Sequence, residues 1–264
     1  MQMEAGINDA DLLIAVTGSD ELNLLCCTVA KRVGDCAAIA RVRNPDYSTE
    51  VGYLREKLGL AMIINPDLEA AKEAARVLSL PTALEVDSFA HGQAELISFT
   101  VPQGNMLDGM EIAELGKSIP TDILICVVER SGEVYIPSGN FTLQAGDNIS
   151  FAATRSTARK FLRQIGFDVD QVKSVMIIGG GKTSYYLAKM LLNSGVSVKI
   201  IELDPERCEE LSVLLPRAVI INGDGSSEEL LREEGITSVG GFVPLTGIDE
   251  ENVMLTLFAS RVSK

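Results

Sequence analysis

The chain has 264 residues, of which 46% are hydrophobic and 23% charged, and its formal net charge is −14. This length predicts about two domains with a buried core, and an acidic chain without a basic stripe argues against nucleic acid or anionic lipid as a direct partner. The 5 cysteines lack CxxC spacing and no apolar run is long enough to span a bilayer, so we expect a soluble cytosolic protein that meets a membrane only through a protein partner.

Residues 1–82 alternate strand and helix patterns. Apolar runs at 12–16, 37–42 and 61–66 predict strands. Helical patterns follow each run, and we expect the second helix to begin near Asp46 and the third to reach about Leu80. This alternation predicts a parallel sheet covered by helices.

Residues 83–167 have a different character. Strand-like segments lie at 94–102, 123–130 and 148–154, separated by Gly and Pro turns. Short helices are expected at 109–116 and 157–166, and QAGDN (144–148) predicts a tight turn. The segment is therefore predicted to form a small α+β domain.

Residues 171–264 return to regular alternation. Strands are expected at 174–180, 196–204, 218–224 and 240–246, and a helical pattern follows each of them. Gly195 is expected to end the first helix, and Pro205 marks the start of the second. Four strands joined by helices predict a Rossmann-like, doubly wound parallel sheet.

The first and third blocks share a repeated segment. TGSDELN (17–23) returns as TGIDEEN (246–252), and an offset of 229 holds across residues 1–33 and 230–262. Such a long period indicates a duplicated domain rather than a solenoid. The expected fold is α/β, with two partial copies of a Rossmann-like sheet flanking the small domain. We expect the first copy to begin before its fourth strand and the second to stop after it, so that the repeat is cut at both ends.

A glycine-rich loop gives the strongest functional signal. In IIGGGKTSYYLA (177–188), the pattern Gly179-x-Gly181-x-x-Ser184 lies between a predicted strand and a helix, as the dinucleotide fingerprint requires. The first glycine permits a sharp turn, and the second lets the backbone approach a pyrophosphate at the helix N-terminus. Ser184 replaces the third glycine with another small residue. The candidate contacts of the loop are Gly179, Gly180, Gly181, Lys182, Thr183 and Ser184.

Polar residues end the neighbouring strands. Glu202 closes the second strand, where a carboxylate can bond both ribose hydroxyls and repel a 2′-phosphate, which favours NAD over NADP. Asp224 and Gly225 follow the third strand, and Thr246 follows the fourth. This edge is where open parallel sheets bind ligands. The alternative is a Rossmann-like domain whose glycines serve only the turn.

Several motifs together resemble one known family. TGSDELN, IARVRNPDY (39–47), GGGKT (179–183), GDGSSEELL (223–231) and TGIDEEN resemble the TrkA-type subunit of the Trk potassium-uptake system, and the resemblance covers essentially the whole chain. It implies two nucleotide-binding domains, each followed by a small C-terminal domain. It also implies a cytosolic ring, peripheral on the inner face of the membrane, that gates a membrane potassium transporter subunit in response to NAD(H), or to ATP or ADP.

The resemblance also assigns residues. It places nucleotide contacts at Gly179–Thr183, at Glu202, and at Thr246 with Gly247. In the first copy it places them at Thr17, Gly18 and Arg41. The Arg41 guanidinium either reaches phosphate or adenine or forms a surface ion pair.

The two partial copies are complementary, because the first lacks a glycine loop and the second lacks a fifth strand. We expect them to meet, within one chain or between two, in one composite sheet. Thr17 and Arg41, or else Thr246, would then face the Gly179–Ser184 loop. The two fourth strands would compete for one place, and the copy with Pro244 is expected to compete less well because proline cannot donate within a ladder.

Two other functions fit the fold class. A hydride-transferring dehydrogenase needs an acid near the nicotinamide, but the single histidine, His91, is expected in a solvated turn. Tyr185 and Tyr186 are expected to pack rather than act as an acid, and no Ser/His/Asp set or metal-spaced cluster is present in the sequence. The ligand-binding domain of a potassium channel would carry one such domain beside membrane helices, whereas this sequence is duplicated. We therefore predict a sensor without enzymatic activity.

Overall fold

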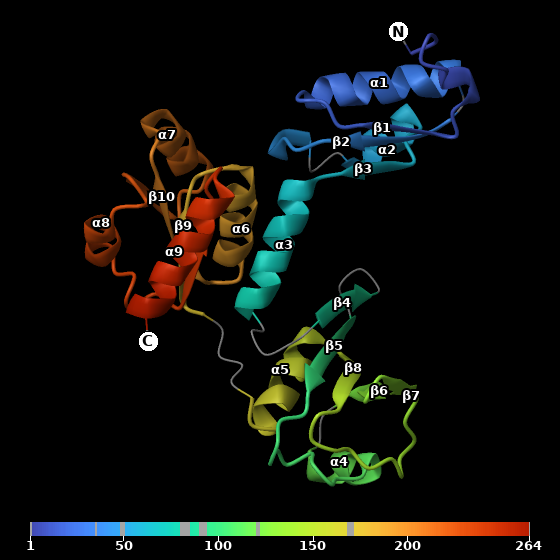
Figure 1. The fold of residues 1–264 in the computed structure, drawn as a ribbon, viewed down its shortest axis with the longest axis vertical. Helices are drawn as coiled ribbons and strands as arrows, with labels where there is room; N and C mark the ends of the chain where they lie inside the picture. Colours follow the sequence, from blue (N-terminus) through green and yellow to red (C-terminus); the bar gives the residue numbers. More distant parts are fainter. Residues whose placement is uncertain are drawn as a thin grey trace. The chain divides into compact units, whose positions relative to one another are not determined.

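The computed structural model describes residues 2–34, 36–47, 51–79, 85–89, 94–119, 122–167 and 172–263 (Figure 1). The chain forms two compact units, one built from Met1–Ala75 with Val172–Lys264 and the other from Arg76–Gln171. The predicted domain boundaries at 82–83 and 167–171 fall on or beside residues outside the described ranges and stay predictions. Within the described residues, no helix is long and apolar enough to cross a membrane.

The first part of the first unit is a three-stranded parallel sheet in the order β1-β2-β3. The Ser19 hydroxyl starts α1 by accepting the Leu22 N–H at 3.1 Å, and the buried side of α1 packs Cys27 against Ala38 and Ala40. The elements are η1 (Ile7–Asp9), β1 (Leu12–Ala15), α1 (Asp20–Val33), β2 (Ala37–Arg41), η2 (Pro45–Tyr47), α2 (Val51–Leu58), β3 (Met62–Ile64) and α3 (Pro66–Ser79).

The second part of this unit is a four-stranded parallel sheet in the order β11-β10-β9-β12. Its central strand β9 is buried along most of its length, as its continuous apolar sequence predicts. The elements are β9 (Ser174–Ile178), α6 (Lys182–Asn193), β10 (Ser197–Glu202), α7 (Pro205–Leu214), β11 (Val219–Asn222), α8 (Glu228–Glu233), β12 (Gly241–Pro244) and α9 (Asp249–Val262). The Rossmann-like fold class is confirmed in both partial copies.

The two copies do not merge into one sheet within the chain. β12 takes the place beside β9, whereas β1 pairs with β2 in the separate sheet. The prediction that the Pro244 copy would compete less well is therefore wrong, and so is a composite sheet within one chain; pairing between chains stays a prediction. The Leu245 N–H donates to the Ile178 carbonyl at 2.8 Å. Because neighbouring residues of a strand face opposite edges, the nitrogen of Pro244 faces away from β9 and no donor is lost there.

The second unit is a five-stranded antiparallel sheet in the order β4-β5-β8-β6-β7. Its core packs Phe99, Phe151 and Phe161 edge to face, and the predicted turn at 144–148 is present with Gly146 at φ +89°. The elements are β4 (Glu85–Phe89), β5 (Ala94–Thr100), α4 (Ile112–Ser118), β6 (Leu124–Arg130), β7 (Glu133–Tyr135), β8 (Asn148–Ala153) and α5 (Arg155–Gln164). The small α+β domain is confirmed.

Candidate functional site

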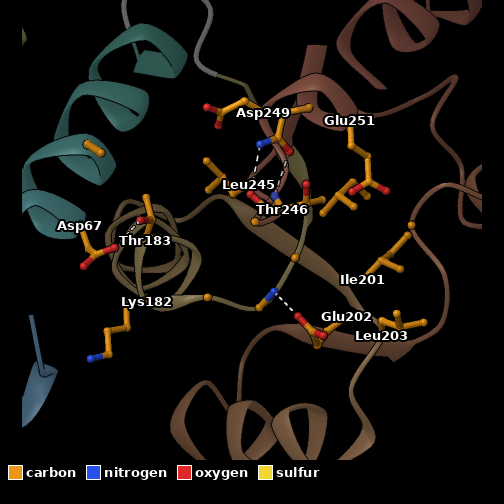
Figure 2. A pocket seen from close by; sticks show the side chains of 18 of the residues that line it. Asp67, Lys182, Thr183, Ile201, Glu202, Leu203, Leu245, Thr246, Asp249 and Glu251 are labelled. Atoms are coloured by element: carbon orange, nitrogen blue, oxygen red, sulfur yellow. Dashed lines mark hydrogen bonds between the residues drawn. The ribbon is translucent and has the colours of Figure 1, made fainter. Parts of the chain in front are cut away.

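A cavity of about 640 Å³ opens at the carboxyl ends of the strands of the second copy (Figure 2). This volume is within the range of small-molecule sites. Ten residues predicted from the sequence line the cavity, namely Gly179, Gly180, Gly181, Lys182, Thr183, Glu202, Asp224, Gly225, Thr246 and Gly247. The fold therefore brings together most of the residues that sequence reasoning proposed.

The glycine loop joins β9 to α6 in the manner that its sequence predicts. Gly179 has φ +93°, and an added Cβ would lie 2.7 Å from the Leu245 carbonyl oxygen, so only glycine fits this turn. At Gly181 an added Cβ would meet nothing within 4 Å. α6 starts directly after Gly181 without a side-chain cap, which leaves N–H groups of its first turn available to an anion.

Glu202 holds the glycine loop against the end of β10. Its Oε2 accepts the Gly180 N–H at 2.5 Å and its Oε1 accepts the Asp204 N–H at 2.8 Å. From α7, the Arg207 Nε donates to the Gly180 carbonyl at 2.7 Å. The middle glycine is thus fixed on both sides, and this positioning role of Glu202 was not predicted from the sequence.

The repeated TGSDELN and TGIDEEN segments form the same hydrogen-bonded turn. The Asn252 Oδ1 accepts the Thr246 N–H at 2.8 Å, and the Asn252 Nδ2 donates to the Thr246 carbonyl at 3.1 Å. Asn23 makes the corresponding bonds with Thr17 at 2.7 and 3.3 Å. The shared asparagine therefore holds the chain between strand and helix in the same way in each copy.

Two residues of the predicted set differ from the rest, because the Asp224 carboxylate is already hydrogen-bonded to Ser226 and Ser184 lies outside the cavity. The exposed Asp224 Oδ1 accepts the Ser226 N–H at 2.8 Å and the Ser226 hydroxyl at 2.7 Å, and these bonds lower the pKa of Asp224. Ser184 is fully buried in α6 and does not line the cavity. A residue at the third glycine position packs inside the unit, so its small size matters more than its hydroxyl.

The first-copy residues Thr17, Gly18 and Arg41 do not line the cavity. The Arg41 Nη2 donates to the Thr17 carbonyl at 2.7 Å, which ties the ends of β1 and β2 together. Of the two alternatives predicted to face the glycine loop, the structure places Thr246 there, because β12 rather than β1 pairs with β9.

Sequence reasoning missed two charged residues from the first copy that line the cavity. The Arg43 Nε lies 2.6 Å from the Asp67 Oδ2. Figure 2 shows the second contact of this carboxylate, in which the Thr183 hydroxyl donates to the Asp67 Oδ1 at 3.0 Å. Both residues follow strands of the first sheet closely, so the rule that parallel sheets bind at strand ends could have indicated them. The other missed lining residues that carry polar side chains are Asp249, Glu251 and Asn252.

The surroundings of this pair favour its charged form. Burial alone would raise the pKa of Asp67, but hydrogen bonds from Arg43 and Thr183 and the charges of Arg43 and Lys182 outweigh it, so the pKa lies below its ordinary value. The hydrogen bond to Asp67 raises the pKa of Arg43. The carboxylate and the guanidinium therefore both stay ionised near neutral pH.

The residues considered for hydride transfer are packed. Tyr185 and Tyr186 are buried in α6; the Tyr186 hydroxyl accepts from the Asn65 Nδ2 at 3.0 Å and donates to the Arg43 carbonyl at 3.3 Å. No group of three or more metal-ligating side chains occurs within the part of the chain that the structure describes, and His91 lies outside the described residues.

Comparison with known families identifies the architecture. The TrkA-N domain model matches residues 1–66 and 175–264, and the TrkA-C domain model matches residues 96–166. The chain belongs to the TrkA-N and TrkA-C domain family. The split TrkA-N match falls on both partial copies of the sheet, and the TrkA-C match falls on the small domain.

Curated relatives carry the same name in distant organisms. The chain is 37% identical over 259 residues to the Trk system potassium uptake protein TrkA homolog of Archaeoglobus fulgidus, covering 98% of this chain and 58% of that protein. It is 34% identical over 263 residues to the Trk system potassium uptake protein TrkA of Haemophilus influenzae, covering 98% of this chain and 57% of that protein. The chain thus spans less than two thirds of these relatives.

Solved structures share the fold. The GsuK RCK domain superposes with a TM-score of 0.65 at 22% identity, covering 97% of this chain and 54% of that chain. A structure described as the GsuK channel bound to NAD superposes with a TM-score of 0.63 at 23% identity, covering 97% of this chain and 44% of that chain. At these identities the likeness concerns the RCK fold alone.

Proposed function

We propose that this chain is part of a TrkA-type regulatory subunit that binds NAD(H) and gates a Trk-type membrane potassium transporter. The observation that carries the proposal is the cavity at the strand ends, where the glycine loop, Glu202 and Thr246 converge. The family membership and the names of the curated relatives support the link to potassium uptake.

The residues of the cavity fit a dinucleotide. Gly179–Thr183 would hold the diphosphate, because the α6 N-terminus favours an anion and the position of Gly181 leaves room for one. Glu202 would bind the ribose hydroxyls. The bound nucleotide would supply binding energy that changes the conformation of the protein, and no residue in the described cavity is assigned to chemistry on it.

The charges of the cavity favour a ligand with few phosphates. The lining residues that carry positive charge are Arg43 and Lys182, and those that carry carboxylates are Asp67, Glu202, Asp224, Asp249 and Glu251. Each further phosphate adds repulsion from this acidic lining. We therefore favour NAD(H), which has two phosphates, over NADP(H) and ATP, which have three.

The proposed partner is a membrane potassium transporter subunit. The resemblance to TrkA-type subunits suggests that contact with it comes from the cytoplasmic side, through protein surfaces. Self-association into a ring would let ligand binding in several chains act on one transporter. Nucleotide binding would then shift the population of ring geometries by its difference in affinity between them.

Calorimetry with NADH, NADPH and ATP tests the nucleotide assignment. We expect NADH to bind most tightly, and Glu202→Ala to weaken it about tenfold or more, since a charge-assisted hydrogen bond is worth roughly 1.5–3 kcal/mol. Glu209→Ala removes the same charge from an exposed position of α7 and should leave affinity unchanged. Glu202→Arg should shift preference toward NADPH. Equal affinity for NADH and NADPH in the unmutated protein would contradict the assignment.

The rival function is a dehydrogenase, and turnover distinguishes it. We expect the protein to oxidise no NADH above background with a panel of carbonyl substrates. The Lys189 Nζ donates to the Tyr185 hydroxyl at 3.3 Å, so reproducible turnover that is abolished by Tyr185→Phe or Lys189→Ala would favour the enzyme instead.

A further inference from the structure

An ion pair from the first copy lies at the start of the helix that follows the glycine loop. Asp67 is the second residue of α3, and its carboxylate accepts from the Arg43 Nε at 2.6 Å and the Arg43 Nη2 at 3.3 Å. Arg43 follows β2, and both side chains line the cavity that Gly179–Thr183 also lines. The candidate nucleotide site is therefore built from both copies.

The carboxylate of Asp67 occupies an anion position. It accepts the Thr183 hydroxyl at 3.0 Å, and Thr183 lies in the first turn of α6, where the helix dipole favours negative charge. Only 13% of the Asp67 side chain is exposed, so water screens this charge weakly. A ligand phosphate that used the same helix end would lie close to a resident negative charge.

Other contacts keep this region together without Asp67. Tyr186 of α6 accepts a hydrogen bond from Asn65, which immediately precedes α3, and donates one to the Arg43 carbonyl. These two bonds are neutral and lie one turn further along α6. The charge of Asp67 can therefore be removed without taking away every hydrogen bond between the two copies.

We propose that Asp67 is a resident anion that competes with the phosphates of the ligand, and that Arg43 is the counter-ion shared between them. This inference rests on the proposed nucleotide-binding function and names the residues that set its affinity. The competition lowers affinity for every phosphate-bearing ligand, and the reduction grows with phosphate charge. Asp67 thus contributes to selection of a dinucleotide over a triphosphate, from a part of the chain remote in sequence from the glycine loop.

Asp67→Asn tests the competition, because it keeps the acceptor for Thr183 and removes the charge. We expect calorimetry to show NADH affinity increased about three- to tenfold and ATP affinity increased more, with adenosine, which has no phosphate, unchanged. The gain should shrink as salt is raised. Glu69→Gln is the matched control, since it removes one negative charge from an exposed site on α3, where Glu69 pairs with Lys72, and should change affinity less than about twofold.

Arg43→Gln completes a double-mutant cycle. We expect it to weaken NADH binding more in the Asp67→Asn variant than in the unmutated protein, because without Asp67 the whole charge of Arg43 is available to the ligand phosphates. An equal loss in both backgrounds would mean that Arg43 is not shared. Asp67→Ser removes the same charge with a smaller side chain, and circular dichroism establishes that each variant is folded.

The outcomes separate the two proposals. If neither the unmutated protein nor any variant binds NADH or ATP, the proposed function is wrong. If the unmutated protein binds NADH but folded Asp67→Asn and Asp67→Ser bind it no more tightly, the nucleotide assignment stands and the competing role of Asp67 is overturned. The same holds if Glu69→Gln gives an equal gain, because general charge would then explain the effect.

Discussion

Gly179 and Gly181 belong to one loop, but an added methyl group should lower the stability of the protein at Gly179 and its affinity for NADH at Gly181. At Gly179, φ is +93° and the added Cβ would lie 2.7 Å from a backbone oxygen, so Gly179→Ala should cost about 2 kcal/mol or more of unfolding free energy. At Gly181 the Cβ meets only open space, so Gly181→Ala should change stability by less than about 0.5 kcal/mol. It should nevertheless weaken NADH binding about tenfold, because the methyl group fills the space that a diphosphate needs.

Thermal unfolding and calorimetry on the two variants check this prediction together. We expect Gly179→Ala to lose stability and Gly181→Ala to lose NADH affinity while staying stable. If Gly181→Ala retained full NADH affinity, the diphosphate would not lie against this part of the backbone.

At the scale of single residues, the sequence predicted most of the candidate site but not its ion pair. The glycine loop and Glu202 follow a spacing rule that belongs to one strand–helix–strand unit, so local sequence suffices to find them. Arg43 and Asp67 reach the loop only because the two copies pack together. Asp67 lies in no quoted motif, and IARVRNPDY, which contains Arg43, pointed to Arg41 instead. The family resemblance, rather than local spacing, assigned Arg41 and Thr17 to nucleotide contacts; in the structure they are bonded to each other and do not line the cavity.

At the scale of elements, the repeated turn provides a matched pair of variants. Asn252→Ala and Asn23→Ala each remove bonds to the backbone of the preceding threonine, and each should cost about 1–3 kcal/mol because backbone groups lose partners. Only Asn252 lines the cavity, so only Asn252→Ala should also weaken NADH binding. Unfolding curves and NADH titrations test both parts; equal loss of affinity in the two variants would mean that the Thr17 turn also takes part in binding.

The predicted elements differ from the observed ones where local backbone geometry decides. The helix predicted at 109–116 is observed at 112–118, because Gly109 has φ +84° and cannot belong to a helix. The sequence pattern did not predict β7, although Ser131 and Gly132 have positive φ and form the two-residue hairpin turn before it. The prediction of strand order was wrong for a different reason. The positions of apolar runs in the sequence do not show whether β1 or β12 lies beside β9.

At the scale of the whole molecule, each unit contains an aspartate–arginine pair in which the aspartate is largely shielded from solvent. In the second unit, the Arg130 Nε lies 2.6 Å from the Asp147 carboxylate, whose side chain is only 1% exposed. Burial would raise the pKa of Asp147, but hydrogen bonds from Arg130 and the Gln144 N–H outweigh it and the pKa is lowered, as it is for Asp67 in the first unit. An ionised aspartate therefore contributes to the stability of both units.

This arrangement predicts acid sensitivity of the whole chain. Because both aspartates have a lower pKa folded than unfolded, their contribution is present above the unfolded value, near pH 4, and is lost as pH falls through the folded value. Asp147→Asn should cost about 3 kcal/mol at pH 7, since it leaves Arg130 without its charged partner, and the variant should lose less than the unmutated protein on further acidification. Glu129→Gln, at an exposed site on β6, is the control. Denaturant unfolding at pH 7 and pH 3 gives the comparison; a variant that loses as much as the unmutated protein would contradict it.

Pro244 gives β12 one backbone N–H fewer than its counterpart β1 for pairing with a further strand. In the first copy, the Asp11 carbonyl accepts from Ala37, so alternate residues of β1, including Ala15, face β2. Pro244 occupies the position of Ala15 and faces the corresponding edge of β12 without an N–H. A strand that joined β12 as β2 joins β1 would lack one hydrogen bond, worth about 0.5–1.5 kcal/mol. Pairing at this edge of β12 would therefore be weaker, by that one bond, than the β1–β2 pairing at the equivalent edge of the first copy.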